Sequence, residues 1–511
     1  MKITATTSDP KQKTKLTRTV DRRSSTRSDD YDEWDSRYML RTDHDDFAAA
    51  YNDMWGGQKA WFKPSCVPIT IILLLIVLVV LLPLLDAAEK QHRSAEHNYT
   101  LNRCHQDCVF TLVETIPDGM SYRNSSTGYP STYETWKGML ARAKTSVEIA
   151  SYYWTLRDED VHDGNDKRSE KWPGSDRGED IFNDLLNIGK QRGIKVKIVQ
   201  SQPSKSQPCL DTEILARKGL AEVRSINMKR LVGAGILHTK LWITDREEVY
   251  VGSANTDWRS LSHVKELGLH VRNCSCLLED YAKIFDAYWE VALPDALIPP
   301  KWPSDLETVF NENHPMTVNV NGSDVSVYLS SSPPQMCPEG RDTDVKSILD
   351  TIEKADHFIY VAVMDYIPLM IYGPKPVYWP VIDDALRAAA INRRVDVKLL
   401  ISYWNHTRSE ERLFLKSLTI LSESYKGVAI SVKFFVVPSS TAQRKIPFAR
   451  VNHNKYMVTD NVAYIGTSNW SGDYFVNTAG VGTIVMGNSS LRQELEDIFM
   501  RDWMSEFAYP I

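Results

Sequence analysis

The feature of this sequence that most constrains its fold is an internal repeat that carries one polar pattern twice. Leu237–Trp258 reads LHTKLWITDREEVYVGSANTDW, and Asn452–Trp470 reads NHNKYMVTDNVAYIGTSNW. Each copy contains H-x-K-x4-D followed by G-[Ser/Thr]-x-N. A chain that repeats a whole pattern in this way is expected to build two similar units, each completed by the other.

The sequence around these motifs is repeated as well. Apolar, β-rich runs follow helical patterns in both copies, and strands that alternate with helices indicate mixed sheets flanked by helices. The matching segments are Tyr133–Ala143 with Val345–Ala355, Thr145–Trp154 with His357–Tyr366, and Gly193–Ser201 with Arg394–Ser402. We therefore expect an α/β fold with two lobes related by a pseudo-twofold axis.

The repeat also predicts the domain boundaries. The first lobe should occupy 111–295 and the second 325–511, with a linker at 296–324. The Pro-rich run LPDALIPPKWP at Leu293–Pro303 punctuates this junction. Residues 86–110 should form a stalk that contains a pair of cysteines.

An apolar run precedes the lobes. Val67–Leu85 contains nineteen residues without a charge, which as a helix would span roughly 28 Å, about the thickness of a bilayer core. Because 66 residues precede it and no small-residue cleavage site follows, we expect a retained signal anchor and not a cleaved signal peptide. The sequence thus predicts a single transmembrane helix that attaches the protein to a membrane.

The flanking charges do not orient this helix, because they are nearly matched on its two sides. Six of the seven cysteines and all the N-x-Ser/Thr sequons lie C-terminal to it, which predicts a lumenal C-terminal part and a type II topology. The expected glycosylation sites are Asn98, Asn124, Asn273, Asn321, Asn405 and Asn488. Asn469 also begins a sequon, but it belongs to the repeated motif and is expected to stay unmodified.

Residues 1–66 should be a disordered cytosolic tail, since they hold twelve Lys/Arg and eleven Asp/Glu with little apolar periodicity. Within the tail, Tyr51–Met54 has the form of a sorting signal read by cytosolic machinery, a four-residue match that is also common by chance. The formal net charge of −6 excludes a protein that coats nucleic acid through overall basicity. Any polyanion must therefore be bound locally.

The repeated motif has the groups needed to displace an alcohol from a phosphodiester. One of His238 and His453 can attack phosphorus while the other donates a proton to the leaving oxygen. Lys240 and Lys455 can neutralise the phosphate charge. A single H-x-K is more simply a half-buried histidine, but two copies with the same downstream pattern favour a paired site.

Neutral donors complete this set, namely Asn255 and Asn469 with Ser253 and Thr467. Alternation should place the histidine and lysine of each motif on one face of a strand, and the next strand should deliver the asparagine. Asp245 and Asp460 have the wrong sign for a phosphate site and are interpreted as structural. The sequence shows no metal-ligand spacing such as H-E-x-x-H, so neither a metal nor another cofactor is expected.

At these residues the sequence resembles the phospholipase D superfamily, and within it the subgroup of phospholipase D family members 3 and 4. The resemblance covers roughly Cys104 to Trp503. The stretches that place the subgroup are HTKLWITD, GSANTDWRSL, VKELGL, NCSCLLEDYAKIFDAYW, YVAVMDYIP, FARVNHNKYMVTD and IGTSNWSGDYF.

The resemblance implies a metal-independent phosphodiesterase with a phosphohistidine intermediate. Its substrate would be single-stranded DNA or RNA, degraded from 5′ to 3′ to 3′-phosphate nucleotides in acidic lysosomes that the protein reaches through the endoplasmic reticulum and Golgi. The alternative is a lipid transphosphatidylase that makes bis(monoacylglycero)phosphate from lysophosphatidylglycerol or related lipids, and the same enzyme could do both. An inactive scaffold or sorting receptor should have lost a motif residue, and none is lost. The resemblance also implies a homodimer, and release of a soluble form by cleavage of the anchor stays open.

Carried onto this chain, the resemblance assigns catalysis to both motif copies and a histidine-orienting role to Glu266. It also implies the disulfides Cys104–Cys276 and Cys108–Cys274, and leaves the pairing of Cys209 and Cys337 open. The second half has Asn477 where some relatives place a glutamate, and we favour His453 as the nucleophile. The catalytic set is His238, Lys240, Asn255, His453, Lys455 and Asn469, with Glu266.

Four aromatic residues near the repeated strands have two interpretations. They can stack on nucleobases, or they can pack in the core and at its rim. These residues are Tyr152, Tyr153, Trp154 and Tyr366.

Overall fold

The computed structural model describes residues 107–122, 128–161 and 171–511, together with Ile71, Leu75, Val77 and Leu81, which are helical. The expected tail and most of the expected anchor lie outside the described residues. No helix in the described part of the chain is both long and apolar enough to cross a membrane. Residues up to Pro83 and those from Leu84 onward form separate units, and the second unit is described below.

The first half of this unit contributes seven strands to a mixed sheet. The three strands at one end are parallel, and the following four pair antiparallel. Their order is β5 (Glu222–Ile226), β4 (Lys195–Ser201), β2 (Ser146–Ser151), β6 (Leu241–Thr244), β7 (Glu248–Gly252), β9 (Glu266–Arg272) and β1 (Asp107–Thr115).

The second half repeats this order and these directions. Its strands run β17 (Ile430–Phe435), β16 (Asp396–Ser402), β13 (Phe358–Val363), β18 (Lys455–Thr459), β19 (Val462–Gly466), β20 (Gly480–Met486) and β11 (Ser323–Ser332). The repeat seen in the sequence is therefore a repeat of strand order.

One strand joins the two halves into a continuous sheet. β10 (Met316–Val320) pairs antiparallel with β11 and parallel with β1. It lies inside the range expected as a linker, and β1 begins inside the range expected as a stalk. Shorter strands are β12 (Asp342–Thr343) on β11, β21 (Ala508–Pro510) on β17, and the pairs β3 (Trp154–Thr155) with β8 (Thr256–Asp257) and β14 (Leu369–Met370) with β15 (Val377–Tyr378).

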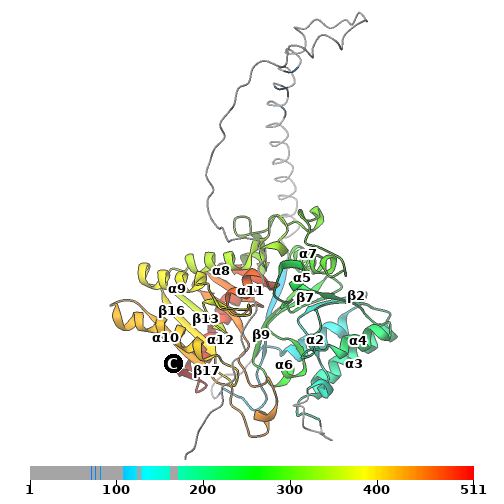
Figure 1. The fold of residues 1–511 in the computed structure, drawn as a ribbon, viewed down its shortest axis with the longest axis horizontal. Coiled ribbons are helices and arrows are strands. Elements are labelled where there is room, and N and C mark those ends of the chain that lie inside the picture. The colour runs from blue at the N-terminus through cyan, green and yellow to red at the C-terminus, as the bar shows by residue number, and fades with distance from the viewer. Residues whose placement is uncertain are drawn as a thin grey trace, which may run out of the picture. The chain divides into compact units, whose positions relative to one another are not determined.

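Helices flank the sheet on both sides, and those of the two halves occupy opposite ends of it (Figure 1). The first half contributes α2 (Thr132–Arg142), α3 (Asp176–Gln191), α4 (Leu210–Arg217), α5 (Met228–Val232), α6 (Trp258–Ser262) and α7 (Ser275–Val291). The second contributes α8 (Asp344–Glu353), α9 (Val381–Asn392), α10 (Ser409–Ser424), α11 (Gly472–Val476) and α12 (Ser490–Met504).

Local sequence explains where these elements begin. α2 starts with a capping box, in which Ser131 Oγ accepts from Glu134 N at 3.1 Å and the Glu134 carboxylate accepts from Ser131 N at 2.8 Å. Such a box satisfies two backbone donors at a helix start. The helices and strands expected in the repeat are confirmed, with boundaries that differ by a few residues.

The cores follow the same division. One buried cluster belongs to the first half and another to the second. A third unites the strands next to the junction with α7 and α12, and it includes Leu112, Phe285, Val485 and Phe499. The halves therefore bury apolar surface against each other, which holds the site between them in one geometry.

A disulfide joins Cys108 to Cys274, as the resemblance implied. Cys276 is also disulfide-bonded, while its expected partner Cys104 lies outside the described residues. Cys209 and Cys337 are both thiols, so the pairing left open for them is not formed.

The expected glycosylation sites fall in two groups. Asn273, Asn321, Asn405 and Asn488 are exposed, whereas Asn98 and Asn124 lie outside the described residues. Asn469, which was expected to stay unmodified, is only 2% exposed.

Candidate active site

Both His-x-Lys motifs lie at the start of a central strand. β6 begins at Leu241, directly after Lys240, and β18 begins at Lys455 itself. Each histidine precedes its strand by two or three residues, and of the two lysines only Lys455 lies within the strand. The Nζ of each lysine donates to the carbonyl of its own histidine, at 2.6 Å in both halves.

The downstream Gly-[Ser/Thr]-x-Asn follows the end of the next strand, β7 or β19. A Cβ on Gly252 would lie 2.4 Å from Gly268 Cα, so only glycine permits this approach of the backbones. Three residues later, Asn255 Nδ2 donates to Tyr153 Oη at 3.5 Å. In the second half, Asn469 Nδ2 donates to Asp365 Oδ2 at 3.2 Å.

Side chains from both halves converge on one cavity of about 710 Å³, whose lining includes His238, His453, Asn255, Asn469 and Glu266. Lys240 and Lys455 are 1% exposed. Ser253 and Thr467, expected to bind phosphate, are fully buried and bond to other protein groups. The two motif copies thus form one composite site.

The two histidines have different partners. The Nδ1–H of His453 donates to Glu266 Oε2 at 2.9 Å, across the boundary between the halves. Glu266 also accepts from Ser253 Oγ at 2.6 Å and Ser260 Oγ at 2.7 Å. A carboxylate held in this way fixes the tautomer of His453 and leaves Nε2 with its lone pair.

His238 has no carboxylate partner among the described residues. Its Nδ1–H donates to the carbonyl of Thr467 at 2.8 Å. The strand register explains this difference between the histidines. Gly252 pairs with Gly268 in the first half, and Gly466 pairs with Gly482 at the equivalent place in the second half. The residue two positions before each second glycine is Glu266 in the first half and, in the second half, a glycine.

That glycine is Gly480, so the expectation that Asn477 is the counterpart of Glu266 is wrong. A Cβ on Gly480 would lie 2.3 Å from Ser468 Oγ and 2.9 Å from Ser332 Oγ. No side chain fits at this position. Asn477 lines the cavity instead.

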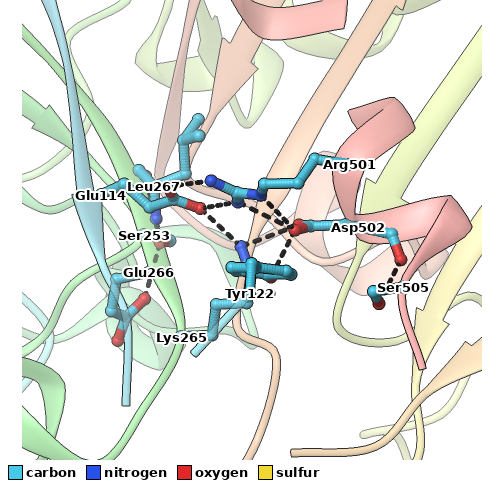
Figure 2. Close-up of polar contacts among 9 residues, drawn as sticks. All are labelled: Glu114, Tyr122, Ser253, Lys265, Glu266, Leu267, Arg501, Asp502 and Ser505. Carbon is cyan, nitrogen blue, oxygen red and sulfur yellow. Dashed lines mark hydrogen bonds and ion pairs between the residues drawn. The ribbon is translucent and has the colours of Figure 1, made fainter. Parts of the chain in front are cut away.

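A buried ionic cluster supports the strand that carries Glu266. Figure 2 shows Lys265 and Glu266 pointing away from each other, with Lys265 Nζ 2.8 Å from both Glu114 Oε1 and Asp502 Oδ2. Burial favours protonation of Glu114, but Lys265 and Arg501 outweigh it and lower the pKa of Glu114 to about 2. The Lys265 carbonyl accepts from His453 N at 2.8 Å, so the cluster anchors the backbone beside both His453 and Glu266.

Burial disfavours positive charge on the bases of the site. Burial, together with Lys240 and Lys455, lowers the pKa of His238 well below its usual value. Burial lowers the pKa of His453 to about 4 although Glu266 opposes the shift, and it lowers the pKa of Lys455 to about 7. An anionic phosphate in the cavity would reverse these effects.

This electrostatic balance predicts an acidic optimum. His453 must be neutral to attack, which holds above its pKa of about 4. Lys455 must be charged to bind phosphate, which holds below its pKa of about 7. We therefore expect kcat/KM to be largest between these values.

We also expect phosphate binding to take up protons at pH 6.5, measurable by calorimetry in two buffers that differ in protonation enthalpy. Proton release on binding, or equal activity at pH 5 and pH 9, would contradict the assignment of His453 as the neutral nucleophile and of Lys455 as the charged phosphate ligand.

The two aspartates interpreted as structural do have that role. Asp245 accepts hydrogen bonds from the backbone of Lys144, Thr145 and Ser146 at 2.7 to 2.9 Å. Asp460 makes the equivalent bonds to 356–358 at 3.0 to 3.2 Å. Each carboxylate ties the turn after the motif strand to the start of the antiparallel strand beside it, β2 or β13.

The four aromatic residues with two interpretations lie in different surroundings. Trp154 is 1% and Tyr366 2% exposed, so both pack in the core. Tyr153 Oη donates to Asp257 and accepts from Asn255. Tyr152, Tyr153 and Trp154 line the cavity.

Two residues that the repeated motif does not include also position groups of the site. Tyr474 Oη accepts from Asn469 at 3.1 Å, and its ring lies 4.9 Å from that of His238. Asp365 accepts from the same asparagine. It corresponds to Tyr153 of the first half, because each lies two residues after the end of the equivalent strand, β13 or β2. Only this alignment of the two halves would have singled out Asp365 in the sequence.

Comparisons with known proteins show to which family the chain belongs. Residues 124–440 match the family described as PLD3/4, PLD-like domain. The chain is 46% identical to the 5′-3′ exonucleases PLD3 of Macaca fascicularis and Homo sapiens over 410 residues, 80% of this chain and 82% of each relative. It is 39% identical to a probable phospholipase D of Caenorhabditis elegans over 453 residues, 87% of this chain and 78% of that relative.

Among solved structures, a phosphatidylserine synthase of Haemophilus influenzae aligns with a TM-score of 0.47 and 11% identity, over 74% of this chain and 85% of that one. The mixed α/β fold and the paired His-x-Lys site define a member of the phospholipase D superfamily. Within it, the chain belongs to the PLD3/4 family.

Proposed function

We propose that this protein is a phosphodiesterase that removes nucleotides from the 5′ end of single-stranded DNA or RNA and releases them as 3′-phosphates. The observation that carries the proposal is the single cavity in which two histidines, each with a buried lysine behind it, and two asparagines meet. The names of the relatives, 5′-3′ exonuclease PLD3, support the choice of substrate.

In the first step of the proposed reaction, His453 Nε2 attacks phosphorus and the bond to the 5′ oxygen of the next nucleotide breaks. Glu266 stabilises the positive charge that develops on the His453 ring. His238 gives a proton to the leaving oxygen, while Lys240, Lys455 and the asparagine amides neutralise the phosphoryl oxygens.

In the second step, His238 accepts a proton from water, and that water attacks the phosphohistidine. The N–P bond breaks, His453 is regenerated, and the 3′-phosphate nucleotide leaves. In the transphosphatidylase chemistry expected as the alternative, a lipid phosphodiester takes the place of the nucleic acid, so that His453 carries its lysophosphatidyl group and the headgroup alcohol leaves with a proton from His238. Attack by the glycerol hydroxyl of an acceptor lipid instead of water then breaks the N–P bond and gives a new phosphodiester lipid.

The deciding experiment uses the purified lumenal part at pH 5 in EDTA, with His453→Ala as the inactive control. Its substrates are a 5′-hydroxyl oligonucleotide, a 5′-phosphate oligonucleotide, and lysophosphatidylglycerol. We expect stepwise shortening of an oligonucleotide from its 5′ end. Transfer to the lipid without any cleavage of oligonucleotides would assign the site to lipid synthesis.

We predict that the enzyme keeps its activity in EDTA. The phosphate charge is neutralised by Lys240 and Lys455, so chelation should leave the rate unchanged. Complete loss in EDTA, restored by a divalent metal, would show that the lysines are insufficient.

We further propose that Val67–Leu85 is a type II membrane anchor and that the protein travels through the endoplasmic reticulum and Golgi to the lysosome. The exposed Asn273, Asn321, Asn405 and Asn488 are then expected to carry glycans, and Asn469, at 2% exposed, should stay bare. In sealed microsomes, added protease should remove only residues 1–66. Protection of that tail would contradict this topology.

A further inference from the structure

The segments that lead into the two His-x-Lys motifs follow equivalent paths. The carbonyl of Ile236 accepts from Ala479 N at 2.9 Å, and the carbonyl of Val451 accepts from Lys265 N at 2.9 Å. Each carbonyl lies two residues before the histidine of its motif. Residues of the two segments can therefore be matched by counting back from that histidine.

Five residues before each histidine, the chain has a left-handed backbone conformation in both halves. The first half has Gly233 there, with φ of 88°, whereas the second has Phe448, with φ of 54°. Glycine adopts this conformation freely, but for a bulky residue it is strained. Strain that persists beside a catalytic motif points to a role for the side chain itself.

The Phe448 ring is displayed to solvent at the mouth of the catalytic cavity. It is 59% exposed, and it lines the same cavity as His238 and His453. One of its faces stacks on His406, with ring centroids 4.6 Å apart and planes at 10°. Its other face is a flat apolar surface, on which no other ring of the described residues stacks in parallel.

Trp404 extends this surface. Its ring lies 4.6 Å from His406 at 66°, and it also lines the cavity. Trp404, His406 and Phe448 are called the aromatic platform below. The loop that follows β4 in the first half lines the cavity with 206–208, which are Ser, Gln and Pro.

We propose that the aromatic platform is a nucleobase subsite, in which a base next to the scissile phosphodiester stacks on Phe448. The inference rests on the proposed nuclease function. Every base has a π face, so stacking binds single strands without sequence preference. The continuity of the platform with the catalytic cavity places this base within reach of the same phosphate.

A basic residue, Arg408, follows the platform residue His406 by two positions in the chain. The Arg408 guanidinium lies 5.9 Å from the centroid of Tyr372, a ring that is 59% exposed and lines the same cavity. A charge at this position suits the phosphate of the adjoining nucleotide. A local basic and aromatic surface is what a chain of net charge −6 needs to hold a polyanion.

The test compares an intact oligonucleotide with one that lacks the bases on both sides of the first scissile phosphate. Phe448→Leu keeps an apolar side chain but removes the ring. Phe448→Trp should restore stacking. Tyr509→Leu is the matched control, because Tyr509 is a 54% exposed ring that does not line the cavity.

We expect Phe448→Leu to raise KM for the intact oligonucleotide about 10-fold, the effect of losing one stacked base, with kcat changed less than about 2-fold. Cleavage of the abasic oligonucleotide should be the same for Phe448→Leu and wild type. Equal losses on both substrates, or no loss on either, would overturn the subsite. If wild-type protein cleaves neither oligonucleotide, the proposed nuclease function fails instead.

A second variant tests the strain independently of substrate. Phe448→Gly should have a higher thermal midpoint than Phe448→Ala, because glycine adopts the left-handed conformation freely and alanine does not. Both variants should lose affinity for the intact oligonucleotide. A lower midpoint for Phe448→Gly than for Phe448→Ala would contradict strain at this position, and full affinity in both variants would overturn the subsite.

Discussion

His238→Ala and His453→Ala are each expected to lower kcat/KM by about 10⁴-fold or more, and the double variant should be little worse than either. The reason is that both histidines act on one phosphorus atom, one as the covalent carrier and one as the proton shuttle. When either step is lost, the other histidine has nothing left to assist. Rates on a 5′-hydroxyl oligonucleotide at pH 5 measure the effect.

His270→Gln is the matched control for this pair. Like both catalytic histidines His270 is buried, and like His453 it is bonded to a carboxylate, here Glu248 at 2.6 Å, but it lies outside the cavity. It should cost stability and leave kcat/KM close to wild type. Additive losses for the two catalytic histidines would mean that each half works separately, against the composite site.

Glu266→Gln is expected to lower kcat by about 10²- to 10³-fold with little change in KM. The amide has the shape of the carboxylate but cannot stabilise a positive His453 ring, and it can donate to Nδ1 and so favour the wrong tautomer. The loss should fall on turnover because that charge develops only when the ring attacks phosphorus. Steady-state kinetics on the same oligonucleotide separate kcat from KM.

Glu248→Gln is the control for this substitution, since it removes the carboxylate partner of His270 and leaves the site untouched. Equal losses of activity in the two glutamine variants would attribute the effect to folding. A Glu266→Gln enzyme with full turnover would show that the contact to His453 has no part in the reaction.

Much of this site could be predicted from the sequence because the motif is repeated. Two copies of H-x-K-x4-D and Gly-[Ser/Thr]-x-Asn place strands, turns and polar groups in matching positions. The structural role of Asp245 followed from its sign alone, and the hydrogen bonds it accepts agree. The disulfide Cys108–Cys274 came from the resemblance and not from spacing.

The asymmetry of the site was harder to predict. Glu266 lies fourteen residues after Gly252, and the same count from Gly466 leads to Gly480. The resemblance pointed to Asn477 instead, where some relatives place a glutamate, and a glycine gives no chemical signal that would correct it. Only the strand register shows that the space of a second glutamate is filled by serine hydroxyls.

Burial explains the other differences. Two of the aromatic residues singled out near the repeated strands, Trp154 and Tyr366, are buried in the core. The exposed ring at the cavity mouth, Phe448, lies in a loop where no periodicity marks it. Its left-handed backbone conformation, which the equivalent Gly233 adopts freely, is seen only in the structure.

We propose that one composite site acts through a covalent phosphohistidine on His453. The most direct test quenches a reaction with a 5′-labelled oligonucleotide in denaturant and maps the labelled peptide by mass spectrometry, in wild type and in His238→Ala with an activated leaving group. We predict a 3′-phosphonucleotide adduct on His453, with overall retention at phosphorus on a chiral thiophosphate substrate. Absence of any adduct, together with single-step inversion, would contradict the covalent mechanism.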